Sequence, residues 1–128
     1  MAALSNFAEN EMLDHMLGTG AYTAPSNVFL SLWTSDPTDA GSGTELSGSS
    51  YARQDINFSA SSSGAAVSSG VVTFPTATGS WGTITHIGIH DAASSGNLLF
   101  HGALTASKAI ANGDVFQVAS TGISITAA

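Results

Sequence analysis

Two segments decide the fold class of this chain: GTITHIGIH at residues 82–90 and NLLFHGALT at residues 97–105. In the first segment Ile87 and Ile89 lie two residues apart, as do side chains on one face of a strand. The linker between them, DAASSG at residues 91–96, consists largely of turn-forming residues. Two such segments joined by a short polar linker are typical of an antiparallel hairpin. The sequence therefore predicts a β-hairpin here more clearly than anywhere else.

The large apolar residues of this hairpin predict its register. Pairing Ile87 with Phe100 and Ile89 with Leu98 places all four side chains on one face of the sheet. A slip by one residue would divide them between the two faces, which would be unfavourable for a half-buried strand pair. We therefore expect these four residues to form one face of the core.

The same register places His86 directly opposite His101, on the other face of the hairpin. Two facing imidazoles are a weak candidate for a metal site. His90 lies roughly 13 Å along the strand from His86 and could not share the same ion. Because two histidines alone bind a metal poorly, we predict a structural cross-strand pair, with no metal and no other cofactor.

The remainder of the chain predicts one helix followed by short strands. Residues 6–17 carry apolar side chains at helical spacing, with Asn6 or Ser5 as N-cap and Gly18 as the left-handed residue at the C-terminal end. Residues 59–70 (SASSSGAAVSSG) have a low-complexity composition typical of a flexible segment. Further strands are predicted at residues 27–34, 51–58, 71–74, 115–118 and 122–126.

This order of elements predicts the architecture. Helices do not alternate with strands, so a parallel nucleotide-binding sheet is disfavoured. The predicted fold is mainly β, an antiparallel β-sandwich or jelly roll with one N-terminal α-helix. We expect a single domain in which residues 1–20 form a helix or arm and residues 21–128 form the β-sandwich.

Charge and cysteine content exclude several classes of function. The 128 residues include 2 basic and 9 acidic side chains, with a formal net charge of -7. Such a chain cannot form the basic patch that binds nucleic acid or an anionic membrane surface. It has no cysteine, which excludes disulfides and cysteine catalysis. The N-terminus lacks the features of a signal peptide and no apolar run is long enough to span a membrane, so we expect a soluble protein.

Sequence motifs do not indicate an enzyme. The chain contains no Gly-x-Ser-x-Gly elbow and no Walker or Gly-x-Gly-x-x-Gly phosphate loop. A Ser-His-Asp triad or a pair of catalytic carboxylates would have to arise from scattered residues, which sequence alone does not indicate. We therefore predict a non-enzymatic protein.

Interface candidates come from the arginine, the aromatic residues and the helix. Arg53 shares a strand face with Asp55 and is a candidate for a buried or interfacial ion pair. Tyr51 and Trp81 are candidate surface anchors, although aromatic residues of this kind more often lie in the core. The apolar side of the helix needs a partner to cover it. It adds three interface candidates: Phe7, Met12 and Met16.

Several segments resemble a family of small structural proteins of tailed phages. The resemblance covers nearly the whole chain, and members of the family are often labelled tail-fibre proteins. Other small β-sandwich proteins of this size look like capsid cement or decoration proteins. The family has no catalytic residues that could be carried over. The segments are SNFAEN (5–10), LDH (13–15), APSNVFLSLWT (24–34), SYAR (50–53), TFPTA (73–77), WGTITH (81–86) and GNLLFHGAL (96–104).

The resemblance implies a structural protein of the virion, for which we formulate one main hypothesis. The protein is a cement or decoration protein on the phage head, made in the host bacterial cytoplasm. It binds the major capsid protein and itself, as a dimer or trimer, and stabilises the shell. The first alternative is a tail, neck or fibre-associated structural or adaptor protein. An alternative of another class is a carbohydrate-binding β-sandwich module with exposed Trp and Tyr side chains that stack on sugars.

Overall fold

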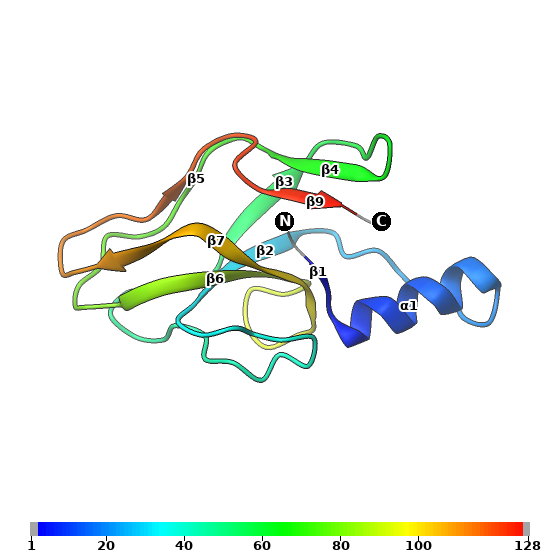
Figure 1. Ribbon diagram of the computed structural model, residues 1–128, viewed down its shortest axis with the longest axis horizontal. Coiled ribbons are helices and arrows are strands. Elements are labelled where there is room, and N and C mark those ends of the chain that lie inside the picture. Colours follow the sequence, from blue (N-terminus) through cyan, green and yellow to red (C-terminus); the bar gives the residue numbers. More distant parts are fainter. Residues whose placement is uncertain (1–2, 127–128) are drawn as a thin grey trace.

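The computed structural model describes residues 3–126 and is mainly β with one helix near the N-terminus (Figure 1). In the described part of the chain, no helix is long and apolar enough to cross a membrane. The elements in chain order are β1 (Ala3–Leu4), α1 (Asn6–Leu17), β2 (Val28–Trp33), β3 (Gln54–Phe58), β4 (Ala65–Ser69), β5 (Val72–Thr73), β6 (Gly82–His90), β7 (Leu98–Ile110), β8 (Gln117–Val118) and β9 (Ser124–Thr126).

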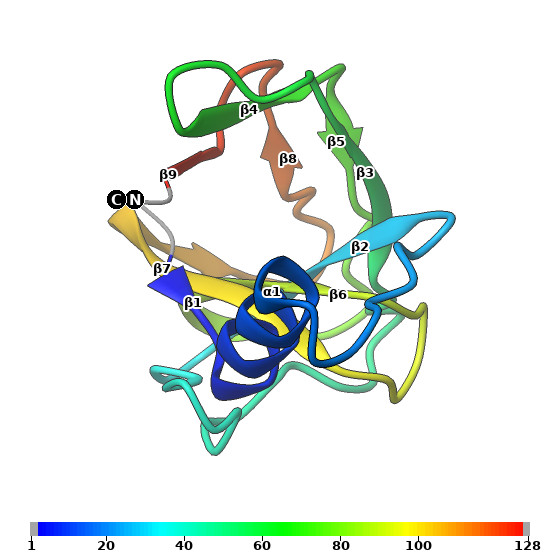
Figure 2. The ribbon, with the colours of Figure 1, turned by 90° about the vertical axis from the view of Figure 1, so that its right-hand side faces the viewer.

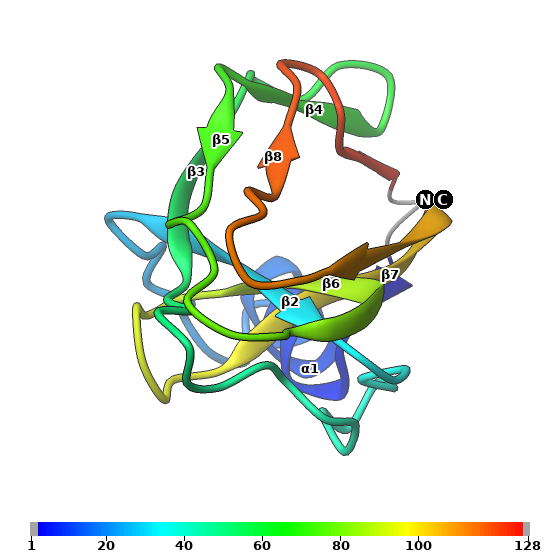
Figure 3. The ribbon, with the colours of Figure 1, turned by 90° about the vertical axis from the view of Figure 1, so that its left-hand side faces the viewer.

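Seven of the strands form one antiparallel sheet in the order β1-β7-β6-β2-β3-β4-β9, and β5 pairs separately with β8. Figures 2 and 3 view the molecule from opposite ends and show the strands curving round a common interior. The architecture lies between a sandwich and a barrel. The predicted antiparallel β fold with one N-terminal helix is confirmed.

The core fills this interior with apolar side chains from most of the strands. Strand β2 lies between β6 and β3 in the sheet. Residues 30–33 in β2 are all buried, because neighbouring elements cover both of its faces. The apolar run in this segment predicted that result. The side chains with the least exposure include Leu30, Leu32, Ile56, Phe74, Ile84 and Ile89.

The central hairpin forms where it was predicted, but its register is shifted by two residues. Ile89 lies opposite Phe100 rather than Leu98. A shift of two preserves the face of every side chain, so apolar alternation could not distinguish the two registers. Ile87 and Ile89 are in the core and Phe100 packs against it. The register shifts again between Ile89 and His90, so Leu98 lies opposite His90. Leu98 is not part of the core cluster, and the prediction that it shares this core face is wrong.

Residues 59–70 are not only a flexible segment, because they include strand β4. This strand pairs with β3 on one side and with β9 on the other. Ser68 is fully buried in it, and its hydroxyl accepts a hydrogen bond from the backbone N–H of Ile123 at 3.1 Å. A serine-rich segment can therefore form a sheet strand here, because the buried Ser68 hydroxyl has a backbone partner.

Helix α1 has the predicted bounds and the predicted C-terminal cap. Ser5 is the N-cap, and its hydroxyl accepts the N–H of Ala8. Gly18 adopts the left-handed conformation, with φ of 77°, that ends the helix. At its N-terminal end the helix is attached through β1, which pairs with β7, and through a hydrogen bond from the Ser5 hydroxyl to the Leu98 carbonyl. Its other end extends beyond the strands (Figure 1).

Candidate functional site

Helix α1 exposes an apolar surface formed by Met12, Leu13, Met16 and Leu17, which we call the α1 stripe. The helix turns by about 100° per residue, so these four side chains cover roughly 140° of its circumference. Met16 is 74% exposed and Leu17 73% exposed. Adjacent exposed apolar side chains are typical of a surface that binds another molecule. The α1 stripe is therefore a candidate interface.

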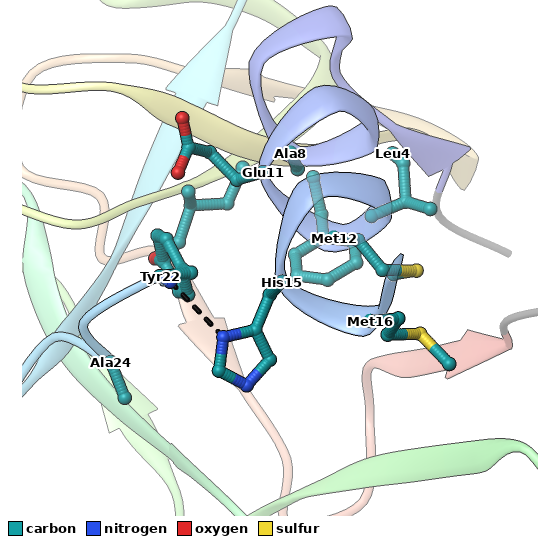
Figure 4. A pocket seen from close by; sticks show the side chains of 10 residues that line it. Leu4, Ala8, Glu11, Met12, His15, Met16, Tyr22 and Ala24 are labelled. Carbon is teal, nitrogen blue, oxygen red and sulfur yellow. Dashed lines mark hydrogen bonds between the residues drawn. The ribbon is translucent and has the colours of Figure 1, made fainter. Parts of the chain in front are cut away.

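A groove of about 330 Å³ lies beside the α1 stripe, between α1, β1 and β7 (Figure 4). Met12 and Met16 line it from the helix, and Leu4 and Phe100 line it from the strands. Figure 4 shows His15 reaching towards the segment that follows the helix, where the backbone N–H of Tyr22 donates to its Nδ1 at 3.1 Å. This bond holds the following segment against the helix and leaves the α1 stripe open.

The three helix residues predicted for an interface differ in their surroundings. Phe7 is half-buried, and its ring meets the edge of the Tyr22 ring with centroids 6.5 Å apart. Met12 and Met16 belong to the exposed α1 stripe and border the groove. Met12 and Met16 are therefore accessible to a partner, whereas Phe7 packs within the chain.

Arg53 forms its ion pair with Glu45 and not with Asp55. Its Nη2 and Nε lie 2.8 Å and 2.9 Å from the two oxygens of Glu45, in a bidentate arrangement. Its Nη1 donates to the backbone carbonyls of Ala92 and Ser95. Asp55 is exposed on β3 and takes no part in this ion pair. Arg53 therefore joins loops of the same chain, and its donors are largely used within the fold.

Burial and hydrogen bonding set the charge states of this cluster. Burial alone would raise the pKa of Glu45, but hydrogen bonds from Arg53 and Tyr51 outweigh it and lower the pKa. The hydrogen bonds to Glu45 raise the pKa of Arg53 against the opposing effect of burial. Burial also raises the pKa of Tyr51, so its phenol stays protonated and donates to Glu45 at 2.8 Å. Arg53 and Glu45 are therefore both charged at neutral pH.

Trp81 lies in the core and Tyr51 is partly buried against it, so neither side chain is a surface anchor. The Tyr51 ring stacks on Phe74 with centroids 6.1 Å apart, and Trp81 meets Tyr51 edge-on at 5.8 Å. Trp81 is 4% exposed, and its indole N–H donates to the Ser49 carbonyl. Each polar group has a partner inside the chain, as buried Tyr and Trp require. The core, where such aromatic residues more often lie, is the correct place for Trp81, and Tyr51 packs against it.

His86 and His101 do not face each other, because the hairpin register is shifted. His101 lies opposite Gly88, and its Nε2 is 2.7 Å from an oxygen of Asp39. The Nδ1 of His86 lies 2.8 Å from the hydroxyl of Thr85. The predicted cross-strand pair is therefore wrong. Within residues 3–126, no group of three or more His, Cys, Asp or Glu side chains is placed to hold a metal ion.

A polar recess of about 570 Å³, which the sequence did not predict, lies between the start of α1, the loop at residues 39–45 and the loop at residues 91–97. Its residues come from segments far apart in the chain, so no local motif could have indicated it. Its lining includes Asn6, Trp33, Asp39, Glu45, His90 and Asn97.

His90 is the most unusual group in this recess, because it is 4% exposed and uncharged at neutral pH. Burial, helped by the nearby charge of Arg53, lowers the pKa of His90 to about 4. Its Nδ1 lies 3.1 Å from the Ser31 hydroxyl, which also accepts the indole N–H of Trp33 at 2.8 Å. The Trp33 and His90 rings are parallel to within 1°. Nε2 of His90 has no hydrogen-bond partner among residues 3–126.

Comparison with known proteins gives one family. A family model described as Podophage GP4 fiber I protein gp80 matches residues 3–126, a range that includes every strand and the helix. No curated protein sequence matches the chain. The family agrees with the resemblance to virion proteins in the sequence. The chain therefore belongs to the phage virion structural protein family described as Podophage GP4 fiber I protein gp80.

Proposed function

We propose that this protein is a non-enzymatic structural component of a phage tail fibre, or of the tail parts to which a fibre attaches. The observation that carries this proposal is the family match over residues 3–126. It favours the fibre-associated alternative over the hypothesis of a cement protein on the head. Small size and a compact β fold, which suggested cement, suit a virion protein at either location.

The α1 stripe supports a role in assembly. A structural component acts by burying surface against its neighbours, and apolar contacts dominate the centre of such interfaces. The α1 stripe offers apolar surface at the end of the molecule where α1 extends beyond the strands (Figure 1). We propose that a neighbouring fibre or tail protein covers it. Nucleic acid and anionic membranes are unsuitable partners, because the chain has only 2 basic residues.

Labelling of intact virions tests this proposal. Gold-labelled antibodies against the protein, viewed by electron microscopy, should mark the tail or its fibres. Heads and tails should also be separated and analysed by mass spectrometry, and the protein should be recovered with the tails. Recovery with heads alone would overturn the proposal and favour the cement hypothesis, with the major capsid protein as partner.

The predicted homo-oligomer, a dimer or trimer, is a further part of the proposal. Light scattering on the purified full-length protein measures its mass in solution. A Met16→Ser and Leu17→Ser double variant would show whether the α1 stripe contributes to self-association. A monomeric wild type at all concentrations would remove self-association from the proposal and leave a heterologous partner for the α1 stripe.

A further inference from the structure

We propose that the groove between α1, β1 and β7, which we call the α1 groove, binds a basic amphipathic helix of a neighbouring virion protein. This proposal rests on the proposed function, because it names the kind of segment that would cover the α1 stripe. The groove has a volume of about 330 Å³, within the range of about 300–1,000 Å³ that is typical of ligand pockets. The chemistry of its two walls determines what it can bind.

One wall of the α1 groove is apolar and partly exposed. Leu4, Met12 and Met16 lie along this wall (Figure 4). Met12 is 36% exposed and Met16 is 74% exposed. Burial of such surface contributes about 25 cal/mol per Å², and the unbranched methionine side chain adapts to a partner of irregular shape. This wall therefore favours an occupant with large apolar side chains.

The opposite wall of the groove is acidic. Glu11 and Tyr22 lie there, with His15 beside them (Figure 4). Nδ1 of His15 accepts the backbone N–H of Tyr22, so this imidazole is neutral and does not offset the carboxylate. Burial raises the pKa of the Tyr22 phenol, and the negative charges of Asp91 and Glu11 raise it further. The potential at this wall is therefore negative, and it favours an ammonium or guanidinium group on the occupant.

The chain itself supplies no cation to this wall. Helix α1 contains Glu9, Glu11 and Asp14, and the sequence has no Lys or Arg before Arg53. Arg53 is held in an ion pair, so a second copy could offer only Lys108. A second copy also has the same net charge of -7, which opposes its approach. Charge complementarity therefore indicates a different protein with basic residues.

The strand pairing at the groove favours a helical occupant over an extended one. An extended segment gains affinity when its backbone pairs with a free sheet edge. At the groove, β7 is already paired with β1 at Phe100 and His101, and β1 has only two residues. A helix satisfies its own backbone and needs only side-chain contacts with α1. The occupant is therefore an amphipathic helix with Lys or Arg beside its apolar stripe.

Three synthetic peptides test this chemistry on the full-length protein. The first is a Leu/Lys peptide of about 15 residues, or about four helical turns, with Leu at helical spacing. The second has Glu in place of every Lys. The third has the composition of the first in scrambled order, so that it has the charge but no apolar stripe. Nuclear magnetic resonance of the methionine methyl groups measures the binding of each.

The Leu/Lys peptide should bind with a Kd of about 10–100 μM and shift the methyl resonances of Met12 and Met16. The Leu/Glu and scrambled peptides should bind at least about tenfold more weakly, because one lacks the charge and the other lacks the stripe. An increase in salt from about 0.05 M to about 0.5 M should weaken the Leu/Lys peptide about threefold, because salt screens exposed charges.

Matched variants place the binding in the groove. Glu11→Gln should weaken the Leu/Lys peptide about threefold, whereas Asp55→Asn, on β3 and outside the groove, should not weaken it. Met16→Ser should weaken it at least about fivefold. Val71 is 59% exposed and lies outside the groove, so Val71→Ser should bind as the wild type does. Met12→Ser is a second apolar variant if Met16→Ser fails to fold.

Cross-linking of intact virions identifies the natural occupant. A zero-length carbodiimide joins a carboxylate to a lysine amine in contact with it. Mass spectrometry should recover Glu9 or Glu11 joined to a lysine of another virion protein, in a segment with apolar residues at helical spacing. A link from either residue to Lys108 of a second copy would overturn the proposal and show an interface between copies.

Two peptide results would also overturn the proposal. One is a Leu/Lys peptide that does not bind at about 1 mM, or that binds no better than the Leu/Glu or scrambled peptide. The other is binding that neither Glu11→Gln nor Met16→Ser weakens, which would show attraction to another acidic surface. These results do not report the location of the protein in the virion. Recovery with heads alone would overturn the tail location and leave the peptide results unchanged, so the two failures are distinguishable.

Discussion

Helix α1 and strand β2 each carry five large apolar residues, but the structure treats them in opposite ways. Strand β2 lies inside the sheet, and Leu30 and Leu32 are completely buried. Helix α1 is attached at its N-terminal end, and Met16 and Leu17 remain mostly exposed. An apolar pattern therefore shows that a surface needs covering, but it does not show whether the covering comes from the same chain.

The comparison predicts where the free energy of folding originates. Burial of apolar surface contributes about 25 cal/mol per Å² only where that surface leaves water. The core side chains between the strands meet this condition, and the α1 stripe does not. We therefore expect substitutions in the two regions to differ strongly in their effect on stability.

The largest effect is expected for Phe74→Ala in the core. Phe74 is 2% exposed, stacks on Tyr51 and meets Phe116 edge-on at 5.7 Å. The substitution should reduce the free energy of unfolding by about 3–5 kcal/mol, because it removes a ring and leaves a cavity. Urea denaturation followed by tryptophan fluorescence measures this change. A loss below about 1 kcal/mol would contradict a core centred on this ring.

A second large effect is expected for Arg53→Met. The substitution leaves the Glu45 carboxylate, which is partly buried, without its bidentate partner. We expect a loss of about 1–3 kcal/mol at pH 7, since an unpaired, partly buried charge costs more than the pair contributes and water solvates it in part. The Arg53→Met/Glu45→Gln double variant should recover part of that loss, and a double-mutant cycle measures the coupling. Strictly additive effects would show that the pair has no such role.

A smaller effect is expected from acid. The pKa of His90 is about 4 in the folded protein and about 6.5 in an unfolded chain. Between these values the unfolded chain binds the extra proton, so stability should fall as the pH decreases from about 6.5 towards 4. The loss at pH 5 relative to pH 7.5 should be about 2 kcal/mol. Denaturation curves at both values test this, and His90→Gln should remove most of the difference.

The smallest effect on stability is expected in the α1 stripe. Met16→Ser and Leu17→Ser should each change the free energy of unfolding by less than about 0.5 kcal/mol, because both side chains are already in water. Thermal denaturation of the isolated protein measures this. The same variants should incorporate poorly into virions if a neighbouring protein covers the stripe. Marked destabilisation of the isolated protein would show that the chain itself covers this surface.

Local signals in the sequence predicted the elements that depend on local contacts. The bounds of α1 and β6 follow from helical spacing, capping residues and strand alternation within a few residues. Strand β1 was not predicted, because two residues carry no pattern and gain their structure from β7. The two-residue shift in the register of the β6–β7 hairpin could not be predicted either, since both registers place the same side chains on the same face.

The site was predictable only where one element supplies it. The apolar residues of α1 indicated a candidate interface, and the exposure of Met12 and Met16 agrees with that prediction. Arg53 was paired with Asp55 by strand spacing, whereas the loop that carries Glu45 brings the actual partner. The polar recess draws on residues spread between positions 5 and 98, so only the folded chain could reveal it.

The attachment of α1 also has a consequence for the time course of folding. The hydroxyl of Ser5 binds the carbonyl of Leu98, 93 residues further along the chain. A ribosome releases the helix long before its anchor on β7, and a 12-residue helix alone is marginal in water. We therefore expect α1 to dock after the sheet has formed. Substitutions in the β1–β7 pairing should then speed unfolding and leave the folding rate nearly unchanged.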